Sequence, residues 1–423
     1  MTGLGTLAIH AGQTSDPNTG SCAVPIHLTS SFEFKSVEFA QNLFELKVPG
    51  YIYTRLGNPT NVAFEERVAA LEGGIGAVSF SSGQQAVAVS LFNLAQSGQH
   101  IVSSTSLYGG TVSLFVNTFK RLGIEVSFVD FANPENVKAA IKPNTRAVFY
   151  ESLANPKNEV LQYEEISKIA HENGLPVVCD NTVLTPVLFR PFDYGVDIAV
   201  YSATKMIGGH GTSVGGVIVD SGKFNWGNEP KKWPQFTEPD PAYHGINFWK
   251  ELGPACYITT CRTNWLRDLG GCLSPVNAFQ FLQGLETLHL RAPKHCENTL
   301  AVAEYLEKHP KVLNVNYPKL KSHPNYELAE KYLPLGAGAI LGFRINGGRE
   351  AGQKFIESVK LATHLANICD ARTLVVHPAT TTHSQLSDAE LQAAGVSADY
   401  IRVSVGLENV EDIIADFEQA LAQ

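Results

Sequence analysis

Lys205 is the residue whose surroundings point most directly to chemistry. It lies in DIAVYSATKMIGGHGTSVGGVIVD (residues 197–220), after a run predicted to form a strand, among small hydroxyl residues and before a cluster of glycines. A lysine amine held close to polar backbone and partly removed from water has a lowered pKa, as a Schiff-base amine requires. The alternative is a solvated loop lysine, so the assignment depends on the other candidate residues.

Asp180 follows a second predicted strand, in the run CDNT at residues 179–182. Ligands of open α/β sheets gather beyond the carboxyl ends of the strands, so this carboxylate is predicted to face a ligand. A buried carboxylate paired with the pyridinium nitrogen of pyridoxal phosphate would keep that ring protonated and strengthen it as an electron sink. An aspartate after a strand is also a common helix cap, and by itself Asp180 leaves both roles open.

A phosphate site is predicted at SSGQ, residues 81–84, between a strand pattern and an apolar-periodic helix. Backbone N–H groups at such a helix start can hold an anion, and Gly83 permits close approach. The run is too short for a Walker loop and no G-x-G-x-x-G follows a strand, so a phosphate monoester fits better than a nucleotide. Ser202 and Thr204, which flank Lys205, would add hydroxyl donors to the same phosphate.

Two further side chains complete the candidate set. Tyr108 in LYGGT follows a strand and precedes glycines, where its ring would lie flat against a planar cofactor or pack in the core. Arg402 in IRVSVGLE stands in an apolar β-like run, and its guanidinium fork suits the α-carboxylate of an amino-acid substrate, with an internal salt bridge as the alternative. His377 and His383 are six residues apart, which is not a metal-ligand spacing, so no metal site is predicted.

The elements that must position these residues alternate between strand and helix. Short β-rich runs predict six strands, at 77–80, 101–103, 126–129, 147–150, 177–179 and 198–201. Apolar residues at three-to-four spacing predict helices at 84–95, 111–122 and 164–173. This alternation predicts βαβ units and an α/β fold, with a mainly parallel sheet flanked by helices on both faces.

Three regions are predicted along the chain. Residues 1–60, rich in Gly, Pro, Asn and Thr, form an extended N-terminal arm, residues 61–256 form the cofactor-binding α/β domain, and residues 257–423 form a smaller C-terminal α+β domain. The last region is predicted to be helical from 274 to 306, with strands at 339–345 and 401–405 and a closing helix after 409. Residues 225–245, dense in Pro and aromatic residues, are predicted to form a long functional loop or a boundary.

Composition places the chain among globular proteins. It has 423 residues, of which 44% are hydrophobic and 17% charged, with a net charge of −9. An acidic balance without a basic tract argues against a nucleic-acid partner. Seven scattered cysteines with no C-x-x-C pair predict reduced thiols, and the lack of an apolar run of about 18 residues predicts a cytoplasmic protein with no membrane partner.

Taken together, the motifs resemble the Cys/Met-metabolism family of fold-type I pyridoxal-phosphate enzymes. The match runs in the family's order over almost the whole chain, through YTRLGNPT, SSGQ, LYGGT, ESLANP, CDNT, YSATK with GGHGT, and IRVSVGLE. The resemblance implies that Tyr53 and Arg55 reach the cofactor phosphate of a neighbouring subunit, in a homotetramer built from dimers. It also implies cofactor contacts from Ser82, Gly83, Gln84 and Asn155, and substrate contacts from Glu151 and from Asn367 beside Arg402.

Within the family, the insertion NEPKKWPQFTEPDPAYHG and the stretch LRDLGGCLSPVNAFQFLQGLETLHLR most resemble the O-acetylhomoserine sulfhydrylase branch. The resemblance implies γ-replacement on O-acetyl-L-homoserine by sulfide or a thiol, giving L-homocysteine or L-methionine and acetate, with Lys205 as the proton shuttle and Tyr108 and Asp180 as further catalytic residues. Cystathionine γ-synthase and methionine γ-lyase share every cofactor residue, but Gly110 stands where methionine γ-lyases typically carry cysteine. A regulatory binding protein without turnover would have little need for Lys205 together with Arg402.

Four positions depart from the common family pattern. Tyr201 stands where histidine is usual, Met206 replaces an aromatic residue, Val183 replaces phenylalanine and Cys369 replaces glycine. These changes concern the surroundings of the cofactor rather than its chemical partners, so they bear on substrate preference.

Overall fold

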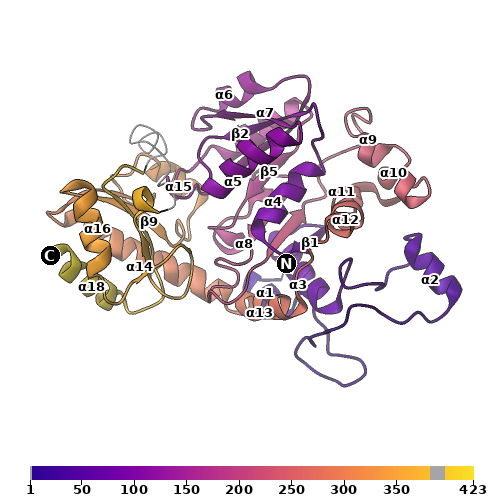
Figure 1. Ribbon diagram of the computed structural model, residues 1–423, viewed down its shortest axis with the longest axis horizontal. Helices are drawn as coiled ribbons and strands as arrows, with labels where there is room; N and C mark the ends of the chain where they lie inside the picture. The colour runs from indigo at the N-terminus through magenta and orange to yellow at the C-terminus, as the bar shows by residue number, and fades with distance from the viewer. Residues whose placement is uncertain (1, 382–395) are drawn as a thin grey trace.

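The computed structural model describes residues 2–381 and 396–423. Figure 1 shows a central sheet wrapped by helices, a smaller C-terminal body on one side of it and the N-terminal arm on the other. His383 lies outside the described residues. Among the helices within these ranges, none has the length and apolar content needed to cross a membrane.

The central sheet has seven strands in the order β1-β7-β6-β5-β4-β2-β3. All neighbours from β6 to β3 pair in parallel, whereas β7 runs antiparallel to both β1 and β6. The strands are β1 (Gly76–Phe80), β2 (His100–Ser104), β3 (Glu125–Val129), β4 (Thr145–Glu151), β5 (Val177–Asp180), β6 (Ile198–Ser202) and β7 (Gly216–Asp220). The six predicted strands and the mainly parallel sheet are confirmed, and β7 was not predicted.

Helices cover both faces of this sheet because its strands are apolar on both sides. Consecutive strand residues point to opposite faces, so in β4 Phe149 packs in one hydrophobic core and Tyr150 in the other. Helices α3 (Pro59–Glu72) and α7 (Tyr163–Glu172) contribute to the core around Tyr150, and α4 (Gly83–Phe92) to the core around Phe149. The predicted flanking layers are therefore confirmed.

Local sequence explains where these helices begin and end. The side chain of Ser82 caps α4 by accepting the Gln85 N–H, and α3 ends at Gly73, whose φ of 79° is left-handed. The predicted helix at 111–122 begins as α5 (Gly109–Ser113) and continues as a π-helical turn (Leu114–Phe119). The other helices around the sheet are α6 (Pro134–Ala140), α8 (Thr185–Leu188), α11 (Cys256–Thr260), a π-helical turn (Cys261–Leu266), α12 (Arg267–Leu269) and α13 (Pro275–Glu286).

The C-terminal body is built on a second sheet of five strands, in the order β10-β11-β12-β9-β8. Its strands are β8 (Val312–Asn316), β9 (Ile340–Ile345), β10 (Thr363–His364), β11 (Leu374–Val376) and β12 (Tyr400–Ser404), and its helices are α14 (Leu288–Lys308), α15 (Tyr326–Tyr332), α16 (Gly348–Ser358) and α18 (Val410–Ala422). The predicted α+β character, both predicted strands and the closing helix are confirmed. The boundary at 256/257 stays a prediction, since α13 packs on α3, with the Phe281 and Phe64 rings 5.5 Å apart.

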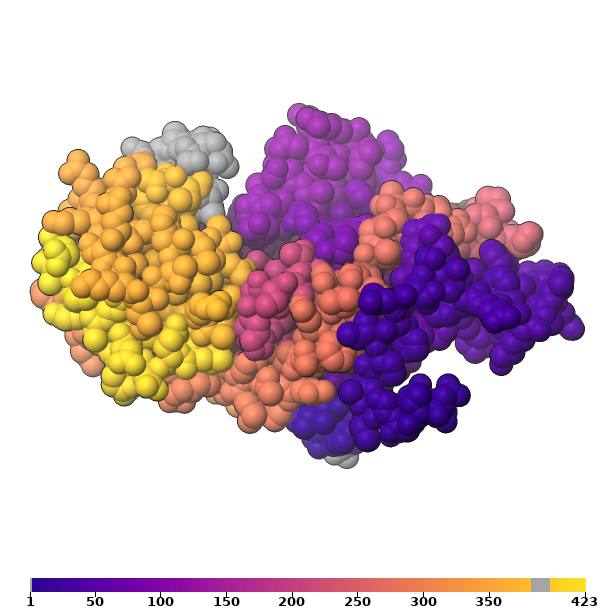
Figure 2. All heavy atoms as spheres, turned by 60° about the horizontal axis from the view of Figure 1, so that its bottom comes forward, coloured from indigo at the N-terminus to yellow at the C-terminus, as the bar shows by residue number. Residues whose placement is uncertain are grey.

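The arm and the insertion differ in how they pack. The arm contains α1 (Leu4–His10) and α2 (Val37–Phe44), leaves Leu28 73% and Val37 87% exposed, and runs along the side of the molecule away from the C-terminal body (Figure 2). The insertion folds into α9 (Pro234–Thr237) and a 3₁₀ turn (Pro241–Tyr243), and α10 (Phe248–Leu252) follows it. Its Trp233 and Phe236 are buried with the preceding Trp226 around Tyr257, so these aromatic residues form core.

Candidate active site

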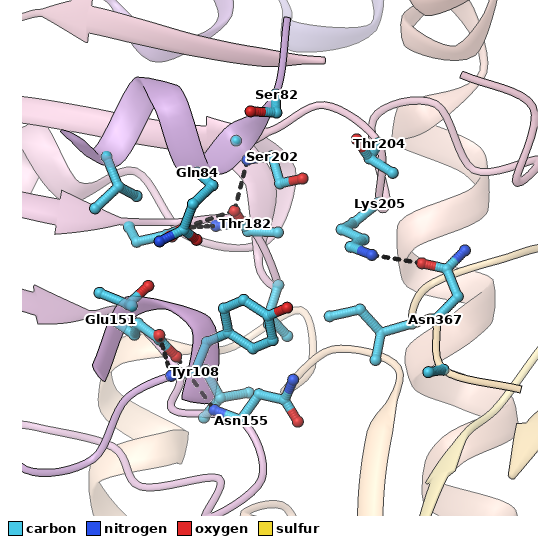
Figure 3. A pocket seen from close by; sticks show the side chains of 18 of the residues that line it. Ser82, Gln84, Tyr108, Glu151, Asn155, Thr182, Ser202, Thr204, Lys205 and Asn367 are labelled. Atoms are coloured by element: carbon cyan, nitrogen blue, oxygen red, sulfur yellow. Dashed lines mark hydrogen bonds between the residues drawn. The ribbon is translucent and has the colours of Figure 1, made fainter. Parts of the chain in front are cut away.

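Most of the predicted site residues meet in one cavity of about 340 Å³ at the carboxyl ends of β4, β5 and β6, closed on the other side by a segment of the C-terminal body (Figure 3). Twelve of them line it: Ser82, Gly83, Gln84, Tyr108, Glu151, Asn155, Asp180, Ser202, Thr204, Lys205, Asn367 and Arg402. Parallel strands that end at one edge deliver their following residues to the same place, which is why residues so far apart in the chain converge.

Lys205 lies in the turn that follows β6, with its side chain directed into the cavity (Figure 3). Its Nζ donates a hydrogen bond to Asn367 Oδ1 at 2.6 Å, across the boundary between the two bodies. Burial lowers the pKa of this amine, and the nearby Arg402 guanidinium lowers it further. The amine is therefore easier to deprotonate than an exposed lysine, as nucleophilic or proton-transfer chemistry requires.

Asp180 is held by the polar group that follows it. The Thr182 hydroxyl donates to Asp180 Oδ1 at 2.5 Å and accepts the Ser202 N–H at 2.7 Å, so it connects the ends of β5 and β6. Burial raises the pKa of the Asp180 carboxyl, and the hydrogen bonds from Thr182 oppose that shift. Asp180 is partly buried and has no cationic partner among the described residues, so it is suited to a cationic ring nitrogen.

Glu151 ends β4 directly beside Asp180, its partner in the β4–β5 register. Its carboxylate accepts the backbone N–H groups of Tyr108 at 2.5 Å and Asn155 at 3.3 Å. Burial, with the neighbouring Asp180 charge, raises the pKa of Glu151. In this structure Glu151 therefore fixes the backbone that carries Tyr108 and Asn155, and its predicted contact with substrate stays a prediction.

Tyr108 lies at the mouth of the cavity. It is 53% exposed, and its ring projects into the cavity from the side opposite Lys205 (Figure 3). Core packing, the alternative considered from the sequence, is therefore wrong. A half-exposed ring at the edge of a cavity can stack on a planar ligand.

The start of α4 forms the end of the cavity nearest Ser202. A Cβ added to Gly83 would lie 2.5 Å from the Ser202 Cβ, so only glycine allows this approach between helix and strand. The first N–H groups of the helix are free of helical partners there, and Ser202 and Thr204 stand beside them. The Thr204 hydroxyl bonds to the Gly215 backbone. Donors at a helix start beside a glycine fit a phosphate group.

Arg402, in β12, brings a buried cation to the cavity. Its guanidinium donates to the Asn367 carbonyl at 3.1 Å and to Asn155 Oδ1 at 3.5 Å. Burial lowers its pKa. Within residues 2–381 and 396–423 no carboxylate forms an ion pair with Arg402, so the internal salt bridge considered from the sequence is wrong there. A buried guanidinium that contacts only neutral oxygens is suited to an anionic ligand group.

Tyr53 and Arg55 do not line the cavity of their own chain. Tyr53 is 42% exposed, the Arg55 guanidinium lies 5.6 Å from its ring, and the same guanidinium donates to the Arg267 carbonyl. A contact between these arm residues and the cavity in one chain is therefore excluded in this conformation.

Sequence reasoning missed several lining residues, namely Val87, Thr111, Leu153, Thr182, Val214, Ala366 and Ile368. Thr182 had a signal, because it stands two residues after Asp180 in the same strand-end run. The apolar ones look like core residues in the sequence. Of the four departures from the family pattern, Val183 lines the cavity, whereas Tyr201, Met206 and Cys369 are buried outside its lining.

Taken together, the cavity offers the groups that pyridoxal phosphate needs. It has an amine of lowered pKa, a partly buried carboxylate for the ring nitrogen, a ring for stacking and a helix start for the phosphate. The group fits the residues present.

Comparison with known proteins agrees with this geometry. The family described as Cys/Met metabolism PLP-dependent enzyme matches residues 5–422. The chain is 51% identical to an O-acetyl-L-homoserine sulfhydrylase of Leptospira meyeri, over 98% of this chain and 96% of that protein, and 51% identical to a homocysteine synthase of Schizosaccharomyces pombe, over 98% and 97%.

A solved structure gives the same result for the fold. The crystal structure of a putative O-acetylhomoserine (thiol)-lyase of Campylobacter jejuni, described with a pyridoxyl-lysine phosphate at position 205 of that protein, superposes with a TM-score of 0.96. It is 39% identical to this chain, and each chain covers 100% of the other. The chain therefore belongs to the family of pyridoxal-phosphate-dependent enzymes of cysteine and methionine metabolism.

Proposed function

We propose that this enzyme replaces the γ-acetoxy group of O-acetyl-L-homoserine with sulfide or a small thiol, releasing acetate and forming L-homocysteine or, from methanethiol, L-methionine. The observation that carries the proposal is the convergence of Lys205, Asp180 and Arg402 on one cavity, in a chain about half identical to sulfhydrylases over nearly its whole length.

Lys205 is the group that would hold the cofactor and move protons. Bound pyridoxal phosphate supplies the electron sink that removal of the substrate's α-proton requires. Lys205 Nζ takes the proton from the α-carbon, and its lowered pKa makes the neutral, proton-accepting amine more available. The hydrogen bond to Asn367 Oδ1 orients the Lys205 amine when that amine is not bonded to the cofactor.

The remaining polar residues bind and orient the cofactor and the substrate. Asp180, held by Thr182, keeps the ring nitrogen of the cofactor protonated, and the start of α4 holds its phosphate. Arg402 binds the substrate α-carboxylate through its guanidinium fork. Tyr108, whose half-exposed ring lines the cavity, would stack on the ring of the cofactor.

The lining also favours an acetyl over a succinyl ester. Lys205 and Arg402 are the cations among the residues that line the cavity, and both have other roles in this proposal. Within the lining that one chain supplies, no further cation is left to balance the second carboxylate of a succinyl ester.

Methionine γ-lyase activity is the second candidate. Gly110 helps to distinguish the two activities, because methionine γ-lyases typically carry cysteine at this position. A Cβ added at Gly110 would lie 2.4 Å from Cε1 of the Tyr108 ring. A side chain at position 110 would therefore change how Tyr108 lies over the cavity, and its absence supports the transferase.

Steady-state kinetics separate these functions. The purified enzyme is given O-acetylhomoserine, O-succinylhomoserine or methionine, each with and without sulfide. We expect homocysteine only with O-acetylhomoserine and sulfide, and slow release of 2-oxobutyrate when sulfide is left out. Rapid 2-oxobutyrate release from methionine without added thiol would show a γ-lyase instead.

The same proposal includes assembly and location. Tyr53 and Arg55 lie outside their own cavity on an exposed arm, and this supports a dimer in which each arm completes the partner subunit's phosphate site. We propose that two such dimers form a homotetramer, located in the cytoplasm.

A further inference from the structure

A chain of buried polar side chains lies directly behind the cavity wall. The Tyr201 hydroxyl donates to Glu72 Oε2, and it accepts a hydrogen bond from Asn181 Nδ2 at 3.1 Å. Asn181 Oδ1 accepts the Ser152 hydroxyl at 2.7 Å. All four residues are buried, and Glu72, Tyr201, Asn181 and Ser152 are each 0% exposed. None of them lines the cavity.

Each member from the sheet is the chain neighbour of a site residue. Asn181 follows Asp180, Ser152 follows Glu151, and Tyr201 precedes Ser202. Neighbouring residues of an extended strand end point to opposite sides, so a group fixed behind the wall fixes the direction of its neighbour in front of it. The polar chain therefore links the ends of β4, β5 and β6, where the cofactor-facing residues begin.

Glu72 is an unusual anchor for such a chain. It is the last residue of α3, where the helix dipole disfavours a carboxylate, and its Oε1 is buried with no hydrogen-bond partner among the described residues. Burial raises its pKa to about 8. Burying a carboxyl group at this position costs free energy, and packing alone does not explain its presence there. Its hydrogen bond with Tyr201 indicates a specific role.

We propose that Glu72, Tyr201 and Asn181 form a positioning network that sets the relation between the ends of β5 and β6, and so holds Asp180 and Ser202 in register with one cofactor. Tyr201 is the central member because it contacts both other residues. The proposal rests on the cofactor role proposed for Asp180 but not on the identity of the substrate.

The first test removes one oxygen atom from the network. Tyr201→Phe keeps the ring and leaves Asn181 and Glu72 without their shared partner. The control is Tyr257→Phe, since Tyr257 is equally buried and its hydroxyl donates to the Ser90 carbonyl at 2.8 Å, away from the cavity. We expect both variants to melt at a lower temperature, and only Tyr201→Phe to bind pyridoxal phosphate about tenfold more weakly, as loss of one buried hydrogen-bond partner predicts.

The absorption spectrum of the bound cofactor gives a second readout. Asp180→Ala is the reference, and we expect Tyr201→Phe to shift the spectrum in the same direction, whereas Tyr257→Phe keeps that of the wild type. Equal cofactor affinity and an unchanged spectrum in Tyr201→Phe, at a stability loss like that of Tyr257→Phe, would overturn the proposal. An unchanged spectrum in Asp180→Ala would show instead that the role of Asp180 is wrong, and the network proposal would fall with it.

Conservative variants keep the test decisive if Tyr201→Phe does not fold. Glu72→Gln retains an oxygen that can accept the Tyr201 hydroxyl, whereas Glu72→Met keeps the approximate length and removes the acceptor. Tyr201→His restores a donor on an aromatic ring. We expect Glu72→Gln and Tyr201→His to bind the cofactor within about threefold of wild type and Glu72→Met to bind it about tenfold more weakly. Equal affinities in Glu72→Gln and Glu72→Met would contradict the proposal.

Discussion

At the scale of single residues, the site depends on groups whose ordinary chemistry is changed by burial. Lys205 is mostly removed from water and contacts Asn367, and the hydrogen-bond partners of Arg402 among the described residues are neutral oxygens. The carboxyls of Asp180, which is partly buried, and of Glu151, which is buried, lie side by side at the ends of two strands. Burying such charges raises the free energy of the folded protein. The opposite charges of a bound cofactor and substrate would offset this cost.

The first prediction concerns Lys205. Lys205→Ala removes the amine proposed to hold the cofactor and to carry the proton, so turnover should fall by at least about a thousandfold and the visible band of the bound cofactor should be lost. Lys168→Ala removes an exposed lysine of α7 as the control, and should keep both. Absorbance and homocysteine formation are measured on the same samples, and a Lys205→Ala chain that retained both would disprove the assignment.

The second prediction uses the pKa of Glu72. Burial raises this pKa from 4.5 to about 8, with the Tyr201 hydrogen bond and the nearby Arg190 opposing the shift and Asp193 adding to it. The folded protein therefore holds the Glu72 proton more tightly than the unfolded chain does. The contribution of this difference to the free energy of unfolding is fully present below pH 4.5, and it is lost as the pH rises through 8.

Glu72→Gln cannot ionise, so its melting temperature relative to wild type should rise steadily from pH 5 to pH 8, by an amount equivalent to at most about 1.4 kcal/mol per pH unit. Thermal melts across this range measure the difference. The control is Glu411→Gln, which makes the same substitution at an exposed position of α18 and shows how much of the difference belongs to position 72. A flat difference for Glu72→Gln would mean that Glu72 ionises normally.

At the scale of elements, the cavity is shaped by how closely α4 approaches β6. Gly83 makes this approach because its Cα faces Ser202 with no room for a side chain. The helix that Ser82 caps thereby presents its first N–H groups to the position proposed for the phosphate. The packing of one helix on one strand thus creates an anion site that neither element has alone.

The third prediction tests that packing. In Gly83→Ala the new methyl group would overlap Ser202, so helix and strand must separate, and cofactor affinity should fall at least about tenfold with a clear loss of stability. Gly109→Ala is the control, since a Cβ at Gly109 meets nothing within 4 Å and the position opens helix α5. Cofactor titration followed by fluorescence measures the affinity. Wild-type affinity in Gly83→Ala would show that α4 can move without consequence for the site.

At the scale of the whole molecule, contacts within a single chain do not explain the residues that the N-terminal arm exposes. It carries exposed apolar side chains, Leu28, Val37 and Phe44 among them, and its Tyr53 and Arg55 lie outside their own cavity. Contiguous exposed apolar surface is typical of interaction sites, contacts between chains among them. A shared active site would account for both observations.

The fourth prediction is that inactive chains complement each other. Mixing Lys205→Ala chains with Arg55→Ala chains, under conditions that exchange subunits, creates hybrid sites with an intact Lys205 from one chain and an intact Arg55 from the other. These hybrids should regain activity, up to about a quarter of that of the wild type if exchange is random and each site works independently. If mass spectrometry confirms exchange and both parents are inactive, yet no activity returns, Arg55 acts within its own chain.

The sequence by itself determined the order of strands and helices along the large sheet and the residues that gather at its edge. The reason is that strand and helix periodicity is local, and residues that follow parallel strands must emerge at the same edge. Lys205, Asp180 and the phosphate run at 81–84 could therefore be located, and resemblance to a family added Glu151, Asn155 and Asn367.

Only the tertiary structure decided how these residues are held. The Tyr201–Glu72 hydrogen bond joins residues 129 apart, and the Lys205–Asn367 bond joins residues 162 apart in different bodies. Glu151 faces backbone N–H groups because the start of α5 lies above β4. Such contacts arise from the packing of elements against one another, and no local pattern of residue types specifies which buried polar groups will meet.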